Sequence, residues 1–252
     1  NRPKALNALN AQVLADLLHS DIAWLIKDLG PDDAAYLLGV LPEERAKEIL
    51  SLMREEDSTE VADLLKYPKD TAGGIMTTEF LALSEDAMAQ EAIQRLQLAT
   101  DAEMVFYIYV TDKDERLVGV LSLRQLLTVP PATSLKNIAT RDVISVTVDM
   151  DQEEVARQVA SYNLLAIPVV DKDNKLVGII TVDDVVDVIR EEATEDMLKM
   201  AGAIEEDSVS KSSSVASAKH RLPWLFTNLV GSLLSGAILW EFRYTIQEVV
   251  AI

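Results

Sequence analysis

Residues 164–196, LLAIPVVDKDNKLVGIITVDDVVDVIREEATED, carry the clearest structural pattern of this chain. Two apolar runs, Leu164–Val170 and Leu176–Thr181, flank the turn sequence DKDN, and this pattern predicts a β-hairpin. Over Asp183–Asp196 the apolar residues recur with a helical period. That predicted helix carries seven carboxylates against one basic residue, Arg190. Carboxylates at this spacing on a helix repel one another. Their number therefore indicates that a cation binds among them.

The same hairpin pattern occurs earlier in the chain, in FYIYVTDKDERLVGVLSLRQLL at residues 106–127. Its acidic turn and its glycine each lie 59 residues before their counterparts, Asp112 before Asp171 and Gly119 before Gly178. Helical patterns precede both hairpins, at 89–98 and 152–161. A unit of this length is too small for a good core of its own. We therefore predict two β-α-β-β-α repeats, 79–137 and 138–196, paired in one domain.

Residues 1–66 predict a helical domain. Short helical patterns recur with similar starts at Gly30, Leu41 and Met53, at a spacing of 11 to 12 residues, with proline or acidic residues in the first turn. Helices of about two turns are not stable alone. They either stack as a small superhelical solenoid or form an ordinary bundle. The sequence YPKDTAGGIMTT, residues 67–78, contains Pro68 and two glycines and predicts a linker.

The C-terminal part predicts two further elements. Residues 197–221 predict a connector helix with a serine-rich break, and 222–240 are LPWLFTNLVGSLLSGAILW, without a charge. This length suits a transmembrane helix, with Trp224 and Trp240 near the two interfaces. The basic residues before it, such as Arg221, place the preceding domains in the cytoplasm. The alternative is a buried core helix.

Composition limits the function classes. The net charge of −19 disfavours a nucleic acid partner, whose phosphates would be repelled. No cysteine is present and only two histidines, so the cation would bind hard oxygen ligands, as Mg²⁺ or Ca²⁺ does. For most individual carboxylates the alternative is a solvated surface position. No constellation of catalytic residues is evident, and we expect that the chain is not an enzyme.

The parts together resemble a known family. The repeats resemble a tandem of CBS domains, and the YP-x-D-TAGG-x-M linker at 67–76 with the acidic helix at 181–196 resembles the MgtE family of Mg²⁺ transporters and channels. The resemblance implies an α+β multidomain chain. It also implies that two copies of the chain form a homodimer through their CBS domains. It implies a multi-pass protein of the cell inner or plasma membrane, with these domains in the cytoplasm. Mg²⁺ bound between the helical domain, the CBS pair and the connector ("plug") helix would favour a closed pore.

The resemblance also implies a set of Mg²⁺ ligands. They lie on the first and last helices of the second CBS repeat, with one acid from the helical domain: Glu153, the Ala160 carbonyl, Asp184, Asp187, Glu192, Glu195, Asp196 and Asp28. Asp32 and Asp33 compete with Asp28 for the last place. Asn163 stands where the family has a further carboxylate, which weakens that ligand position. Asp184 and Asp187, three residues apart, share a helix face on the spacing alone.

CBS domains also suggest an alternative ligand, an adenine nucleotide such as ATP. The family uses a Thr or Ser and an Asp at the start of the last helix for the ribose. The second repeat has both, as Thr181 and Asp184, whereas the first has Ser122 and Gln125. The alternative function is therefore a nucleotide-sensing CBS module that regulates another transporter or an enzyme.

Overall fold

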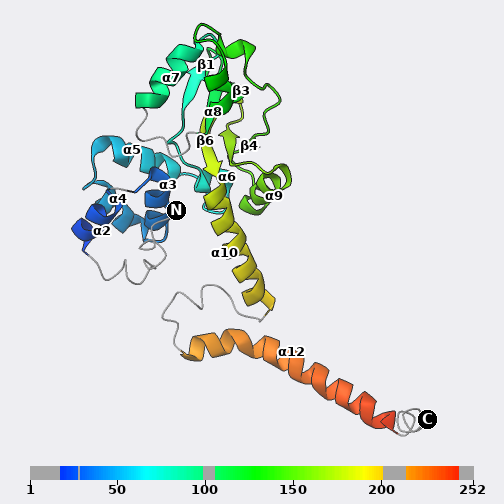
Figure 1. Ribbon diagram of the computed structural model, residues 1–252. Coiled ribbons are helices and arrows are strands. Elements are labelled where there is room, and N and C mark those ends of the chain that lie inside the picture. The colour runs from blue at the N-terminus through cyan, green and yellow to red at the C-terminus, as the bar shows by residue number, and fades with distance from the viewer. Residues whose placement is uncertain (1–17, 28, 99–105, 201–213, 244–252) are drawn as a thin grey trace. The chain divides into compact units, whose positions relative to one another are not determined.

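The computed structural model of the protein describes residues 18–27, 29–98, 106–200 and 214–243. They form a mixed α/β structure in which a helical region precedes two three-stranded sheets (Figure 1). The chain divides into two compact units, with the boundary between Glu192 and Ala193. The first unit therefore contains the helical region and both sheets.

The helical region consists of short helices, as the sequence predicts. They are α2 (His19–Ile26), α3 (Pro31–Gly39), α4 (Glu43–Leu50) and α5 (Glu55–Leu64). Pro31 is the first residue of α3, and acidic residues fill the first turns of α3, α4 and α5, where the helix dipole favours negative charge. Helix α2 packs on α4, and α3 packs on α5. Alternate helices therefore stack, which is the arrangement of a superhelix rather than of an up-and-down bundle.

Both predicted repeats are present and have the same topology. The first contains β1 (Ala82–Ser84), α7 (Ala89–Leu98), β2 (Tyr107–Thr111), β3 (Leu117–Ser122) and α8 (Leu123–Thr128). After a 3₁₀ turn, Leu135–Asn137, the second contains β4 (Val146–Thr147), α9 (Gln152–Tyr162), β5 (Ala166–Val170), β6 (Leu176–Thr181) and α10 (Val182–Met200). In each sheet the middle strand is parallel to the first strand and antiparallel to the third.

The two hairpin turns repeat in atomic detail. The Oδ1 atom of Asp112 accepts hydrogen bonds from two backbone N–H groups of its own turn, each at 2.9 Å, and Asp171 does the same. Glu115 and Asn174, again 59 residues apart, adopt left-handed backbone conformations, with φ of 64° and 62°. These matching turns confirm the repeat that the sequence predicts.

The two repeats exchange short segments. Thr77, before β1 of the first repeat, pairs with Ile179 in β6, and Thr140, before β4 of the second repeat, pairs with Val120 in β3. Each pairing brings one segment against the backbone at a glycine of the LVG sequence. A Cβ atom on Gly178 would lie 2.6 Å from the sulfur of Met76, so only glycine allows this approach. The exchange makes the repeats one structural body.

Helix α6 (Ala72–Ile75) connects the helical region to the second repeat. Its residues and the adjacent Met76 belong to a buried cluster that continues from the helical region into the core under β5, β6 and α10. The first repeat has a separate core of its own. A third, smaller cluster that includes Tyr109 and Ile179 lies between the two sheets.

The C-terminal part differs from the prediction. Helix α10 continues through the predicted boundary at Asp196 to Met200, because no glycine or proline interrupts it before Gly202. Of the predicted connector at 197–221, residues 197–200 belong to α10 and 214–221 to α12 (Ser214–Glu241), and 201–213 lie outside the described residues, so the connector as a whole stays a prediction.

The predicted membrane span at 222–240 is also corrected. These residues are helical, as part of α12. Across the described residues, however, no helix combines the length and the apolar character that crossing a membrane requires. Polar residues such as Asn228, Ser232 and Ser235 dilute the apolar character of the uncharged stretch.

Candidate acidic site on helices α9 and α10

Asp184 lies at the buried start of α10. Its Oδ2 atom accepts a hydrogen bond of 2.6 Å from the hydroxyl of Thr181, and the two residues are 5% and 1% exposed. A buried carboxylate requires such donors, because desolvation otherwise penalises its charge. Thr181 and Asp184 are therefore in direct contact, and their binding of a nucleotide ribose stays a prediction.

The same positions in the first repeat form a helix cap. The Ser122 hydroxyl accepts from the Gln125 backbone N–H at 3.2 Å, and the Gln125 side-chain oxygen accepts from the Ser122 backbone N–H at 2.9 Å. This reciprocal arrangement is a capping box. The Thr181–Asp184 pair therefore also has a purely structural explanation, the start of α10.

Farther along α10, predicted ligands pair with basic residues of the same helix. Asp187 lies 3.6 Å from the guanidinium of Arg190, and Glu195 forms an ion pair with the ammonium group of Lys199. These pairs are three and four residues apart, the spacing at which side chains meet on a helix surface. A cation at Asp187 or Glu195 would compete with these neighbours. Asp196 lies on the exposed surface of the same helix.

Helix α9 carries the other two predicted ligands. Glu153 forms an ion pair of 2.9 Å with Arg157, and this hydrogen bond and charge raise the pKa of the Arg157 guanidinium. Ala160 is in the last turn, where backbone carbonyls lack partners within the helix and can act as ligands. Glu153 and Ala160 are seven positions apart, which is about 10 Å along the helix, so the two cannot bind one ion.

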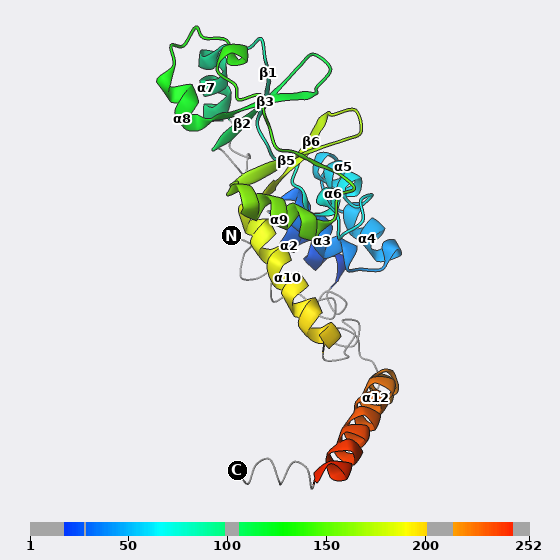
Figure 2. The ribbon, with the colours of Figure 1, turned by 90° about the vertical axis from the view of Figure 1, so that its right-hand side faces the viewer.

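Among the described residues, side-chain hydrogen bonds connect α10 to helices α9 and α3 (Figure 2 shows α9 beside α10). The side-chain amide of Gln152, the first residue of α9, donates to Oε1 of Glu192 at 2.7 Å. The hydroxyl of Tyr36, on α3, donates to Oε1 of Glu191 at 3.1 Å. Sequence reasoning missed Gln152 and Tyr36, because no spacing rule relates residues 40 or 155 positions apart.

The described residues do not form a preassembled metal site. Among them, no three His, Asp or Glu side chains lie close enough together to hold a metal ion. Asp28, the predicted ligand from the helical domain, lies outside the described residues. Its competitors Asp32 and Asp33 are in the first turn of α3, where carboxylates stabilise the helix N-terminus. The donor chemistry of α9 and α10 fits a hard cation such as Mg²⁺, but the structure does not gather the donors around one point.

Asn163 has a structural explanation. It ends α9 in a left-handed conformation, with φ of 52°, and its N–H donates to the Val159 carbonyl. Asparagine is one of the few residues that adopt this conformation readily. The residue that breaks the expected ligand pattern is therefore well suited to its place as a helix C-cap.

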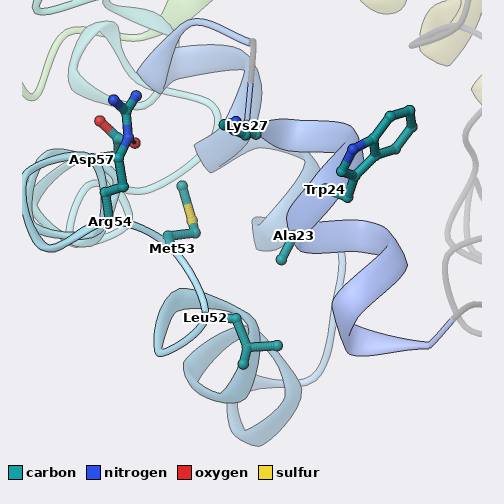
Figure 3. Close-up of a pocket in the computed structure, with 7 residues that line it drawn as sticks. All are labelled: Ala23, Trp24, Lys27, Leu52, Met53, Arg54 and Asp57. Atoms are coloured by element: carbon teal, nitrogen blue, oxygen red, sulfur yellow. Dashed lines mark hydrogen bonds and ion pairs between the residues drawn. The ribbon is translucent and has the colours of Figure 1, made fainter.

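A separate cavity lies in the helical region. It has a volume of about 380 Å³, and Figure 3 shows its lining, which combines apolar side chains with charged ones: Ala23, Trp24, Lys27, Leu52, Met53, Arg54 and Asp57. Arg54 and Asp57 form an ion pair at 2.8 Å across its edge. None of the predicted ligands lines this cavity, so it is distinct from the acidic helices.

Comparison with known proteins gives this geometry a family. Residues 5–70 match the family model of the MgtE intracellular N domain, and 72–132 and 135–191 match that of the CBS domain. The magnesium transporter MgtE of Thermus thermophilus is 42% identical over 189 residues, which are 74% of this chain and 42% of that protein. The chain spans about two fifths of the length of the curated relatives that it matches.

Solved structures of related proteins indicate the same family. A crystal structure of the soluble part of a magnesium transporter is 40% identical, with a TM-score of 0.67, and the match covers 73% of this chain and 72% of the other. A crystal structure of the cytosolic domain of the Mg²⁺ channel MgtE in complex with ATP is 39% identical, with a TM-score of 0.63, and the match covers 71% of this chain and 78% of the other. The chain, with a helical N domain followed by a CBS pair, therefore belongs to the MgtE family.

Proposed function

We propose that this chain is the Mg²⁺-sensing regulatory region of a Mg²⁺ transporter or channel. Mg²⁺ would bind between the N domain, the CBS pair and the connector helix and favour a closed pore. The observation that carries this proposal is the position of α10, whose carboxylates Glu191 and Glu192 contact α3 of the N domain and α9 of the second repeat. Magnesium transport as the role of the family supports the same conclusion.

The coupling between Mg²⁺ binding and the closed conformation follows from electrostatics. The carboxylates of α9 and α10 outnumber the basic residues of these helices, so the helices repel one another on balance when no cation is present, and a cation shared between elements brings them together. A conformation that gathers these ligands binds more Mg²⁺ than one that does not, so Mg²⁺ shifts the population towards it. The dispersed ligands of the described residues suit this mechanism, because the site would be completed by the ion. Mg²⁺ retains several waters and requires few carboxylates.

The test is a Mg²⁺ titration of the chain, followed by radius of gyration, protease sensitivity and melting temperature. We expect compaction, protection and a rise in melting temperature, since a ligand that binds the folded state stabilises it. Asp187→Ala and Glu195→Ala should each raise the Mg²⁺ concentration needed, whereas Glu91→Ala, an exposed acid on α7 of the first repeat, should not. No response of the wild-type chain to millimolar Mg²⁺ would refute the proposal.

We propose further that the chain forms a homodimer through its CBS domains and has a regulatory rather than a catalytic role. The N domain and the CBS pair would lie in the cytoplasm at the cell membrane, and membrane helices of the whole protein would form the ion path. Light scattering of the purified chain, with and without Mg²⁺, tests the dimer. A mass that stays at one chain across the concentration range would contradict it.

The second candidate is adenine-nucleotide sensing. A relative at 39% identity is known as a complex with ATP, and Thr181 with Asp184 supplies a hydroxyl and a carboxylate in the second repeat. Calorimetry with ATP and with AMP tests this candidate. Binding should be lost in Asp184→Ala if this pair contacts the ribose, and retained affinity in that variant would exclude the pair.

A further inference from the structure

We propose that Gln152 is a positioning residue that holds the Glu192 carboxylate in place for Mg²⁺. This inference rests on the proposed function, because it concerns how one of the proposed ligands is oriented. Gln152 directly precedes Glu153, another proposed ligand, so its side chain joins the two ligand-bearing helices.

The contact is well buried on the glutamine side. Gln152 is 7% exposed, and its Nε2 atom lies 2.7 Å from Oε1 of Glu192. A buried amide loses its hydrogen bonds with water and requires a protein partner. The bond is charge-assisted, because its acceptor is ionised, and such bonds fix geometry more strongly than neutral ones.

The donor to Glu192 is neutral, as is the Thr181 hydroxyl that donates to Asp184. Glu153, Asp187 and Glu195 each face a basic side chain of their own helix. An amide donor leaves the full negative charge on Glu192 and occupies one of about four acceptor positions on the carboxylate. A cation would therefore meet an oriented carboxylate without first displacing the bound ammonium or guanidinium group of a neighbour. Partners of this kind orient metal ligands in many proteins.

The experiment is a Mg²⁺ titration by calorimetry and by melting temperature on the chain with Gln152→Ala. We expect the Mg²⁺ concentration at half-saturation to rise about tenfold, the lower end of the effect of removing a residue that orients a metal ligand. Gln158→Ala is the matched control, since Gln158 is a part-buried glutamine of the same helix whose amide faces the sulfur of Met150. Its half-saturation should equal that of the wild type.

Two further variants separate positioning from structure. Gln152→Glu keeps the side-chain length but places a second charge beside Glu192, so its melting temperature in chelator should fall and its gain with Mg²⁺ should exceed that of the wild type. Glu192→Gln combined with Gln152→Ala should bind no more weakly than Glu192→Gln alone, because contacting residues are coupled.

The outcomes are distinguishable. A wild-type chain that does not respond to Mg²⁺ overturns the proposed function. A responding wild type, with half-saturation unchanged in Gln152→Ala and in Gln152→Glu, overturns only the role of Gln152. If Gln152→Ala does not fold, Gln152→Glu decides, and a gain in melting temperature with Mg²⁺ equal to that of the wild type in this variant overturns the inference.

Discussion

The two CBS repeats share a hairpin and differ in the helix that follows it. After β3, the short helix α8 carries Arg124 and no acidic residue, and after β6, α10 extends over 19 residues with carboxylates along most of its length. The same difference appears at the caps, where Ser122 and Gln125 form a neutral capping box and Thr181 pairs with the ionisable Asp184. The first repeat thus has a neutral capped helix at this place, and the acidic excess belongs to the second repeat alone.

The repeats also differ in what they pack against. The first has a core of its own, whereas the core of the second continues into the N domain. The repeat with the acidic helix is therefore the one joined to the neighbouring helical domain. That placement allows charge changes on α10 to act on the contact with α3, where Tyr36 meets Glu191.

The largest expected effect concerns the exchanged segments. Gly178→Ala would place a Cβ atom 2.9 Å from the Thr77 carbonyl oxygen and 2.6 Å from the Met76 sulfur, whereas Gly119→Ala would meet the Ala139 methyl at 2.8 Å and the Thr140 carbonyl oxygen at 3.3 Å. We expect Gly178→Ala to lower the free energy of unfolding by about 3 kcal/mol and Gly119→Ala by about 1 kcal/mol. Urea denaturation measures both. Equal losses of unfolding free energy in the two variants would contradict the expected difference between the repeats.

The next effect concerns the caps. Thr181→Val removes the hydroxyl that donates to the buried Asp184 carboxylate, and we expect a loss of about 2 kcal/mol, as for other hydrogen bonds to charged groups. Ser122→Ala, its matched counterpart in the first repeat, should cost about 1 kcal/mol, the usual value for an N-cap. Both variants are compared by urea denaturation without Mg²⁺. A larger loss for Ser122→Ala would contradict the distinction between the caps.

A smaller effect tests the contact of α10 with the N domain. Tyr36→Phe removes the hydrogen bond to Glu191 and should destabilise the chain by about 1 kcal/mol or less, because the contact is solvent-accessible. Hydrogen exchange should increase in α3 more than in α7 of the first repeat. Tyr162→Phe, at a 59% exposed tyrosine on α9, is the control and should leave exchange in α3 unchanged.

The smallest expected effect is on acid sensitivity. A hydrogen bond from the Thr147 side chain, with help from the backbone of Asp149 and the charge of Lys172, lowers the pKa of Asp149 below its ordinary 3.8. The folded state therefore binds fewer protons at Asp149 than the unfolded state, so this stabilisation is present above pH 3.8 and is lost as the pH falls through the lowered pKa.

Asp149→Asn should accordingly lose slightly less stability than the wild type as the pH falls from about 5 to about 3. Urea denaturation across this range measures the difference, and the size of the effect is limited because the carboxylate is exposed. Parallel stability curves for the two proteins would show that Asp149 does not contribute to the acid response of the second repeat.

Much of the fold could be predicted from the sequence. The 59-residue offset, the hairpins and the helix at Ala89–Leu98 are all found in the structure, because alternating apolar runs, acidic turns and paired glycines are local signals. Helix α10 extends to Met200, beyond the predicted boundary, and the predicted membrane span at 222–240 is wrong for the described residues, because the absence of charge does not by itself make a helix apolar enough.

The candidate site was predictable only in part. Its carboxylates are visible as a charge excess on one helix, and their assignment to Mg²⁺ came from the resemblance to the family. The partners of these carboxylates were not visible. Arg157 and Lys199 follow from helical spacing, whereas Gln152 and Tyr36 come from elements far away in the sequence.

The repeat, the hairpins and the concentration of negative charge on the last helix of the second repeat can be read from the amino-acid order, because each is a property of neighbouring residues. Which carboxylates face another element, and which are neutralised by their own helix, depends on the folded structure. The folded structure also decides that Thr77 and Thr140 cross to the opposite repeat. The physical reason is that such contacts depend on how packed elements meet in space, and burial of a polar group such as the Gln152 amide selects its partner only after the chain has folded.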